Sequence, residues 1–145
     1  MSGTQWFRGQ VERGLAQVWG AEHVKPDCDG DYGFRSDTAM GWVRLHDEPV
    51  AGVSVFAVAA HGLRPLKAVL REVNEINLSS GPAKVALDDG WVTVEMLLPA
   101  DQVNAESLGT ACARVMAIAS RTGPLFAAIH GGQTPFGEAE EQQAG

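Results

Sequence analysis

The chain has 145 residues, of which 45% are hydrophobic and 20% charged. This is the size and composition of one globular domain, and it excludes a chain that is disordered or membrane-like as a whole. Eleven Lys and Arg against eighteen Asp and Glu give a net charge of −7, and no run of basic residues occurs. Because nucleic-acid binding draws on a basic patch that displaces counterions from phosphates, the sequence argues against a DNA or RNA partner.

The cysteines and the first residues predict a cytoplasmic protein. Cys28 and Cys112 belong to no C-x-x-C pair, which favours reduced thiols in a cytosol. Met1–Phe7 lacks the apolar core of a signal peptide, and the longest apolar run, Val50–Ala60, is too short to span a bilayer. We therefore expect no membrane partner.

The chain begins with a segment that predicts a helix over about Ser2–Trp19. Four apolar residues recur in it at intervals of three or four, and this spacing places them on one face of a helix. They are Phe7, Val11, Leu15 and Val18. Gly20 provides a stop, and the Pro-, Asp- and Gly-rich residues of Ala21–Gly33 predict a loop.

Three strands are predicted next, at Tyr32–Arg35, Met40–Leu45 and Val50–Ala60. A polar turn that contains a proline, residues 46–49, joins the second to the third as in a hairpin. Both faces of the third strand are partly apolar, which is typical of a strand in the middle of a sheet.

An amphipathic helix is predicted to begin after Pro65 and to end near Asn77. Its apolar stripe has members three and four residues apart: Leu66, Val69, Leu70, Val73 and Ile76. Two strands follow, Ala83–Leu87 and Trp91–Leu98. The acidic turn between them ends at Gly90 and predicts a hairpin in which this glycine takes a positive φ.

The last helix is predicted over about Asp101–Thr122, with an interruption at Gly123-Pro124 and a continuation at Leu125–Ile129 as another turn or short helix. The element order is α-β-β-β-α-β-β-α, which predicts an α+β fold with a mostly antiparallel five-stranded sheet and packed helices. Residues 1–132 form the predicted single domain, and residues 133–145 a flexible acidic tail.

The sequence predicts no catalytic residue, no metal site and no cofactor. Carboxylates in the loop Asp27–Asp31 are spaced two apart, as in calcium loops, but Tyr32 and Thr38 stand where such loops need a glycine and a bidentate glutamate. We interpret this segment as a solvated acidic loop. The four histidines are not paired at helical spacing, and no nucleophile or phosphate-binding motif occurs.

Three aromatic residues on predicted strands are the candidate binding residues: Trp42, Phe56 and Trp91. Large aromatic side chains mostly belong to a core. The functional alternative is an apolar groove that accepts a peptide, and these three side chains are then the candidates for its lining.

The stretch Leu70–Pro99, LREVNEINLSSGPAKVALDDGWVTVEMLLP, resembles the YbjN-like and type III secretion chaperone-like proteins of bacteria, including Ala- and Val-rich actinobacterial members. The resemblance lies in the element order, the helix that ends in Asn74 and Asn77, the acidic-Gly turn and the strand that closes in Leu-Pro. A later segment, Ile129–Gly132, is similar to the family's hydrophobic-x-Gly-Gly ending, and the resemblance covers about Trp6–Gly132. A plain structural reading is that the two asparagines only cap the helix.

The resemblance implies the same fold and a non-enzymatic module that binds a protein or an extended peptide in a chaperone-like or regulatory role. It also implies a homodimer with the middle helix at the interface, and the apolar stripe of this helix then faces either the sheet or the symmetry mate. Two alternatives stay open. One is a small enzyme or ligand-binding protein whose internal pocket joins His61 to Glu95 or Asp101. The other is a regulatory subunit that docks through its acidic tail.

Overall fold

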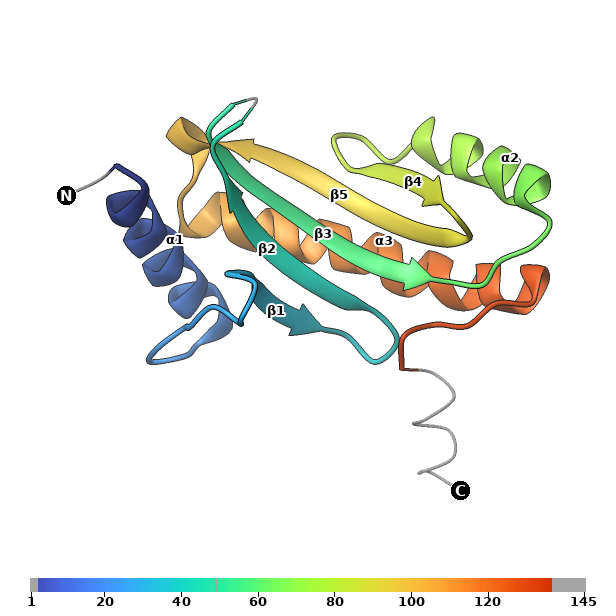
Figure 1. The fold of residues 1–145 in the computed structure, drawn as a ribbon, viewed down its shortest axis with the longest axis horizontal. Coiled ribbons are helices and arrows are strands. Elements are labelled where there is room, and N and C mark those ends of the chain that lie inside the picture. Colours follow the sequence, from blue (N-terminus) through green and yellow to red (C-terminus); the bar gives the residue numbers. More distant parts are fainter. Residues whose placement is uncertain (1–2, 49, 137–145) are drawn as a thin grey trace, which may run out of the picture.

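A computed structural model describes residues 3–48 and 50–136 of the chain (Figure 1). The elements follow the predicted order, and their bounds are α1 (Gly3–Trp19), β1 (Tyr32–Arg35), β2 (Met40–His46), β3 (Gly52–Ala60), α2 (Leu66–Asn77), β4 (Lys84–Asp88), β5 (Trp91–Pro99), the short 3₁₀ helix η1 (Ala100–Gln102) and α3 (Ala105–His130). None of the helices in these residues is long and apolar enough to cross a membrane.

The five strands form one antiparallel sheet in the order β1-β2-β3-β5-β4, and β3 is its central strand, as predicted. The chain leaves β3 for α2 and β4 at the far edge, and β5 then returns between β4 and β3 (Figure 1). The predicted α+β class and the antiparallel five-stranded sheet are thus confirmed.

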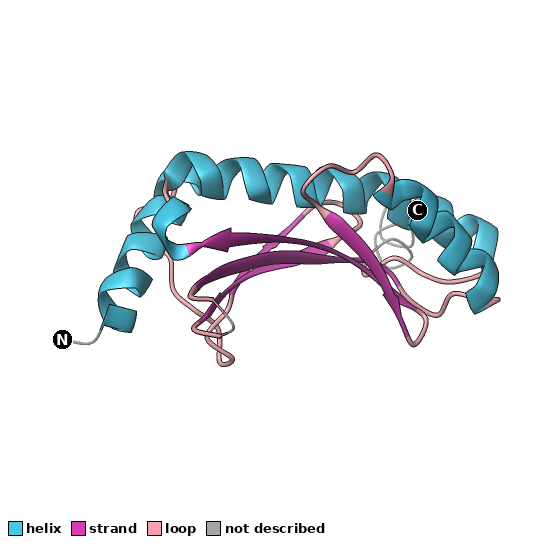
Figure 2. Cartoon of the chain, turned by 90° about the horizontal axis from the view of Figure 1, so that it is seen from above, coloured by secondary structure: helices cyan, strands magenta, loops and turns pink. Residues whose placement is uncertain are grey.

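The two faces of the sheet have different neighbours. Alternate strand residues point to opposite faces, and α3 lies along one face only (Figure 2). Under α3 the sheet presents small and β-branched residues that are fully buried, and these residues are Val43, Val53, Val55, Ala57, Val92 and Val94. In the part of the chain that the structure describes, no helix runs across the opposite face (Figure 2). We call it the open face.

Helix α3 runs unbroken through Gly123 and Pro124, so the predicted interruption was wrong. Leu125–Ile129 are helical, but they belong to α3 rather than to a separate turn or short helix. The helix begins later than predicted, because Asn104 and Ser107 form a reciprocal capping box. It ends at His130, where Gly131 takes a φ of 73° as the left-handed C-cap.

Tertiary contact explains why α3 continues. A Cβ atom on Gly123 would collide with the backbone carbonyl of Ala59, so glycine lets the helix touch β3 directly. Ala119 and Phe126, a turn before and a turn after, are buried against the same sheet. An interior proline costs about 3 kcal/mol in an isolated helix, and the packing on both sides of Pro124 offsets this cost.

Side chains also fix two short connections around β4. Asn77, at the end of α2, donates its amide to the carbonyl oxygen of Val85 and accepts the Val85 N–H, both at 2.8 Å. It therefore joins the helix to β4 rather than only capping it. In the β4–β5 turn, Gly90 has a φ of 82° and Asp89 a φ of 50°, which confirms the predicted positive φ of Gly90.

Helix α1 is fastened to the start of β1 by a buried phenol. The Tyr32 hydroxyl donates to a Glu12 carboxylate oxygen at 2.6 Å and accepts from the Arg8 guanidinium at 2.7 Å. Burial, and then the hydrogen bond to Glu12, raise the pKa of Tyr32 from its ordinary value of 10.0 to about 12.

We predict that Gly123→Ala lowers the free energy of unfolding by about 1–3 kcal/mol, because the new methyl group pushes α3 away from the backbone of β3. Urea denaturation followed by circular dichroism measures this loss. Gly109→Ala is the matched control on the same helix, since its Cβ meets only a Val18 side chain that can shift. If both variants have the same stability as the wild type, the close approach does not exist.

We predict that the phenol of Tyr32, the single tyrosine of the chain, titrates near pH 12 in the folded protein. A raised pKa means that the folded state holds its proton more tightly than the unfolded state. The resulting stabilisation is complete below pH 10 and is lost as pH rises towards 12. Phenolate absorbance at 295 nm, with circular dichroism on the same samples, provides the measurement. A midpoint near 10 while the chain is still folded would contradict the buried network.

Candidate functional site

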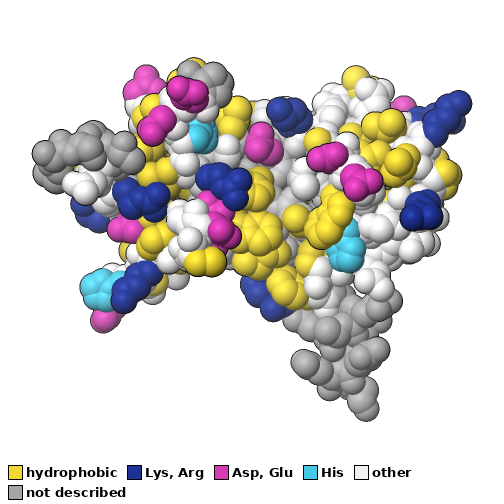
Figure 3. Space-filling model, in the orientation of Figure 1, with side chains coloured by type: hydrophobic (Ala, Val, Ile, Leu, Met, Phe, Trp, Pro, Cys, Tyr) yellow, Lys and Arg dark blue, Asp and Glu magenta, His cyan; other side chains and the backbone are white. Residues whose placement is uncertain are grey.

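The open face carries rows of side chains that run across the strands. In the central row Trp42 stands opposite Phe56, and Phe56 opposite Glu95. A second row, nearer the end of β3, brings Met40 opposite Val58. Figure 3 shows hydrophobic side chains gathered at the centre of this face with charged side chains around them. The open face therefore has an apolar centre and a charged rim.

The structure brings the three predicted aromatic residues to this face and leaves them partly exposed. Trp42 and Phe56 stack with ring centroids 5.5 Å apart. Trp91 stacks on His61 with centroids 4.8 Å apart and is 48% exposed. None of the three belongs to the fully buried core.

A cavity of about 310 Å³ opens between these aromatic pairs. Its lining comes from the strands through Met40, Trp42, Val58, His61 and Trp91, and from the residues after α3 through Pro135 and Phe136. The lining is mostly apolar, and the Trp and His side chains add flat surfaces and polar N–H groups. This surface can hold an aliphatic or aromatic side chain.

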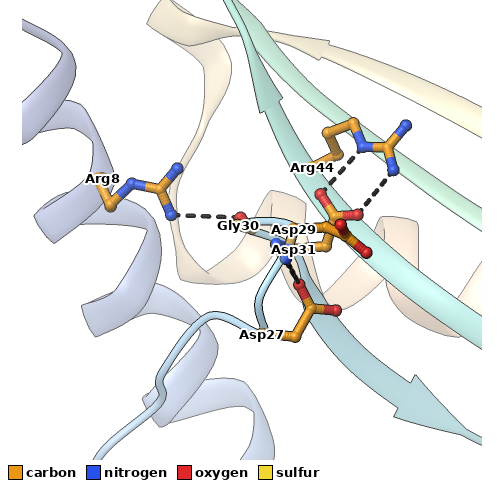
Figure 4. Close-up of polar contacts among 6 residues, drawn as sticks. All are labelled: Arg8, Asp27, Asp29, Gly30, Asp31 and Arg44. Atoms are coloured by element: carbon orange, nitrogen blue, oxygen red, sulfur yellow. Dashed lines mark hydrogen bonds and ion pairs between the residues drawn. The ribbon is translucent and has the colours of Figure 1, made fainter.

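An ion pair borders the aromatic centre at the β1 side. The carboxylate of Asp31 accepts two hydrogen bonds from the guanidinium of Arg44, at 2.9 and 2.7 Å (Figure 4). Asp31 is buried, and its hydrogen bond raises the pKa of Arg44. The same guanidinium lies 5.1 Å from the ring centroid of Phe56, so a fixed positive charge stands beside the aromatic rings.

The acidic loop before β1 is organised by its own backbone. One carboxylate oxygen of Asp27 accepts the N–H groups of Asp29 and Asp31, at 2.9 and 3.0 Å (Figure 4). Because Asp31 is already paired with Arg44, two of the three loop carboxylates are engaged within the chain. Over residues 3–48 and 50–136, no group of three His, Cys, Asp or Glu side chains could hold a metal ion.

The apolar stripe of α2 divides between the core and the surface. Val69 and Val73 are buried within the chain, and Ile76 packs partly against the core. Leu66 and Leu70 are 45% and 53% exposed. Val69, Val73 and Ile76 therefore hold α2 on its own domain. Of the stripe, only Leu66 and Leu70 remain available to another molecule.

The alternative pocket that would join His61 to Glu95 or Asp101 is not assembled. His61 stacks on Trp91 at one end of β3. Glu95 belongs to the central row, where its Oε1 lies 4.0 Å from the Nζ of Lys84. Asp101 follows the Gly52–Pro99 pair at the opposite end of β3.

Sequence reasoning missed several residues of the cavity. Met40 and Val58 alternate with core residues on predicted strands, so strand periodicity contains the signal that places them beside Trp42. No comparable local pattern identifies Pro135 or Phe136, whose place depends on where the chain goes after α3.

Comparisons with known proteins agree with this geometry. The family described as T3SS (YopN, CesT) and YbjN peptide-binding chaperone 1 matches residues 5–138. A chain of the ExsC–ExsE complex superimposes with a TM-score of 0.68 at 16% identity, covering 87% of this chain and 97% of that one. No curated protein shows significant similarity.

Two further solved structures share the fold. A chain of the HopA1–SchA chaperone–effector complex has a TM-score of 0.65 at 14% identity, over 85% of this chain and 97% of that one. A chain of the heterodimeric ExoU–SpcU complex from the type III secretion system of Pseudomonas aeruginosa has a TM-score of 0.56 at 21% identity, over 80% and 97%. With the family matched over nearly the whole chain, and its secretion chaperone-like fold seen in the sheet and helices, this protein belongs to the T3SS and YbjN peptide-binding chaperone 1 family.

Proposed function

We propose that this chain is a non-enzymatic module that holds an extended segment of another protein on the open face of its sheet, in a chaperone-like or regulatory role. The observation that carries the proposal is an uncovered sheet face with partly exposed aromatic side chains, in a member of a peptide-binding chaperone family. The partner is a protein segment in extended conformation.

The open face offers two kinds of contact to such a segment. Trp42, Phe56 and Trp91 supply broad apolar surfaces at which alternate side chains of an extended chain can dock. The strand β1 lies at the edge of the sheet and pairs only with β2 among the described residues, so an added strand can bond to its outer side. Apolar pockets and backbone pairing together give a site that needs no catalytic group.

Other properties of the chain fit a binding role inside the cell. Burial raises the pKa of the Cys112 thiol to about 12, which makes this cysteine a core residue rather than a nucleophile. The three similar solved structures are each described as a complex of two named proteins, and one of them as a chaperone–effector complex. We infer a cytoplasmic protein with a domain that ends near residue 132 and a tail whose first residues, Gln133–Phe136, lie back on the sheet. The part of the predicted flexible tail at 137–145 lies outside the described residues.

The exposed part of α2 supports a homodimer. Leu66 and Leu70 are one helical turn apart on one face, and both are about half-exposed. A two-fold axis would bring this pair against its own copy in a self-complementary contact, the commonest arrangement in oligomers. Val69, Val73 and Ile76 then support the interface from within each chain.

We predict that an extended peptide from a captured partner binds the chain with a dissociation constant below about 100 µM, and that Trp42→Ala weakens binding about tenfold or more because a central aromatic contact is lost. Fluorescence anisotropy of labelled peptides, scanned across the proteins captured on the immobilised chain, measures the affinity. Leu125→Ala, an exposed apolar truncation on α3, is the control and should bind like the wild type.

Two results would remove this function. One is that no scanned peptide binds in that range. The other is that moderate salt abolishes binding entirely, since apolar contacts are only weakly screened.

We predict that the wild-type chain sediments at twice its 15.4 kDa mass at high micromolar concentration, and that Leu70→Asp sediments at the single mass because the charge desolvates poorly in an apolar contact. Leu125→Asp places the same charge on α3 and should remain dimeric. A wild-type chain that is monomeric throughout the concentration range would exclude the α2 interface.

A further inference from the structure

The residues that follow α3 return to the sheet. Gln133 pairs with His61 just beyond the end of β3, and each backbone N–H donates to the carbonyl oxygen of the other residue at 2.9 Å. The chain then passes the start of β2 and reaches the end of β1, where the Arg35 guanidinium lies 3.6 Å from the ring centroid of Phe136. Figure 1 shows this segment descending from the end of α3 beside the β1–β2 loop.

This segment lies along the edge of the aromatic cavity, on the part of the open face where a short bound peptide would lie. Gln133 adds one backbone pair to β3, Pro135 and Phe136 form a wall of the 310 Å³ cavity that Trp42 and Trp91 also line, and the aromatic ring receives a cation. Backbone pairing, apolar contact and a cation–π contact are the interactions that an extended ligand would make on this face.

Glycine at the preceding position permits the approach. A Cβ atom on Gly132 would collide with the carbonyl oxygen of His61, so a larger residue would push the segment off β3. Gly131, with its φ of 73°, turns the chain out of α3 towards the sheet. The turn and the close contact both direct the following residues onto the open face.

We propose that Gln133–Phe136 is an internal competitor for the peptide-binding face, and that a partner segment which presents an aromatic side chain displaces it. This inference rests on the proposed function and adds the chemistry of the partner: an aromatic residue that takes the place of Phe136 under Arg35. The pairing of Gln133 with His61 and the cation–π contact of Phe136 are of the same kinds as the contacts that a longer partner segment would make, so such a segment can replace them.

Competition within the chain has a quantitative consequence. A tethered segment acts at an effective concentration in the millimolar range. The apparent dissociation constant of a partner is its intrinsic value divided by the fraction of chains in which the segment has left the open face. Loosening the segment should therefore tighten partner binding without any new contact.

The first test uses the full-length chain and the indole N–H signals of its four tryptophans in ¹⁵N NMR spectra. Phe136→Ala should shift the Trp42 and Trp91 signals and leave Trp6 and Trp19 unchanged. Arg35→Gln, which removes the cation from the sheet side, should shift them in the same way. Leu125→Ala should shift none of the four. If neither Phe136→Ala nor Arg35→Gln moves the Trp42 or Trp91 signal, the segment does not lie on the open face.

The second test separates competition from mere contact. A capped synthetic peptide of residues 131–141 is added to the wild-type chain and to full-length Phe136→Ala, beside the same peptide with alanine at position 136. The unaltered peptide should shift the Trp42 and Trp91 signals of the variant at concentrations at least about threefold lower than in the wild type. The alanine peptide should be weaker on both. Equal response of the two chains would overturn the proposal.

Partner peptides complete the design. They should bind Phe136→Ala about threefold tighter than the wild type, and Leu125→Ala with unchanged affinity. Equal affinity for the wild type and Phe136→Ala would leave the segment a structural feature and refute competition. If no partner peptide binds any of these chains, the proposed function fails, while the peptide of residues 131–141 still decides whether the segment competes for the open face.

Discussion

The backbone contact between α3 and β3 is the constraint on which the remaining architecture depends. Gly123 lets the longest helix of the described chain rest directly on the carbonyl of Ala59, in the middle of the sheet. A helix this close to the central strand covers one face over its whole length. The valines of the strands are buried under this helix, and the alternate residues of the same strands therefore point to the other face.

This alternation between the two faces explains why a small domain has large aromatic side chains near solvent. Trp42 and Phe56 reduce their exposed area by stacking on each other, and Trp91 does so with His61. The Asp31–Arg44 pair fixes a charge at the rim, where it stays in contact with water. The open face is thus stable enough to exist in the free chain, and its exposed apolar area can still be covered by another molecule.

Local sequence patterns predicted most of the fold, because most helices, strands and turns have a characteristic pattern within a few residues. Strand alternation, the amphipathic stripe of α2 and the Asp-Gly turn at Gly90 placed those elements to within about two residues. The predicted helix break at Pro124 was wrong, because packing against residues far away in sequence outweighs the helix-breaking effect of this proline. The same limit applies to the site. Trp42, Phe56 and Trp91 could be chosen by residue type, but the partners of Phe136 exist only once the chain has folded back on β1.

A sheet with two edge strands can add a further strand at either edge, and the Asn77 side chain occupies one position of the β4 edge. By bonding both backbone groups of Val85, its side chain stands in for one residue of a sixth strand beyond β4. An approaching chain finds that position of β4 already satisfied. At this position the β4 edge is thereby guarded against unspecific strand addition and aggregation.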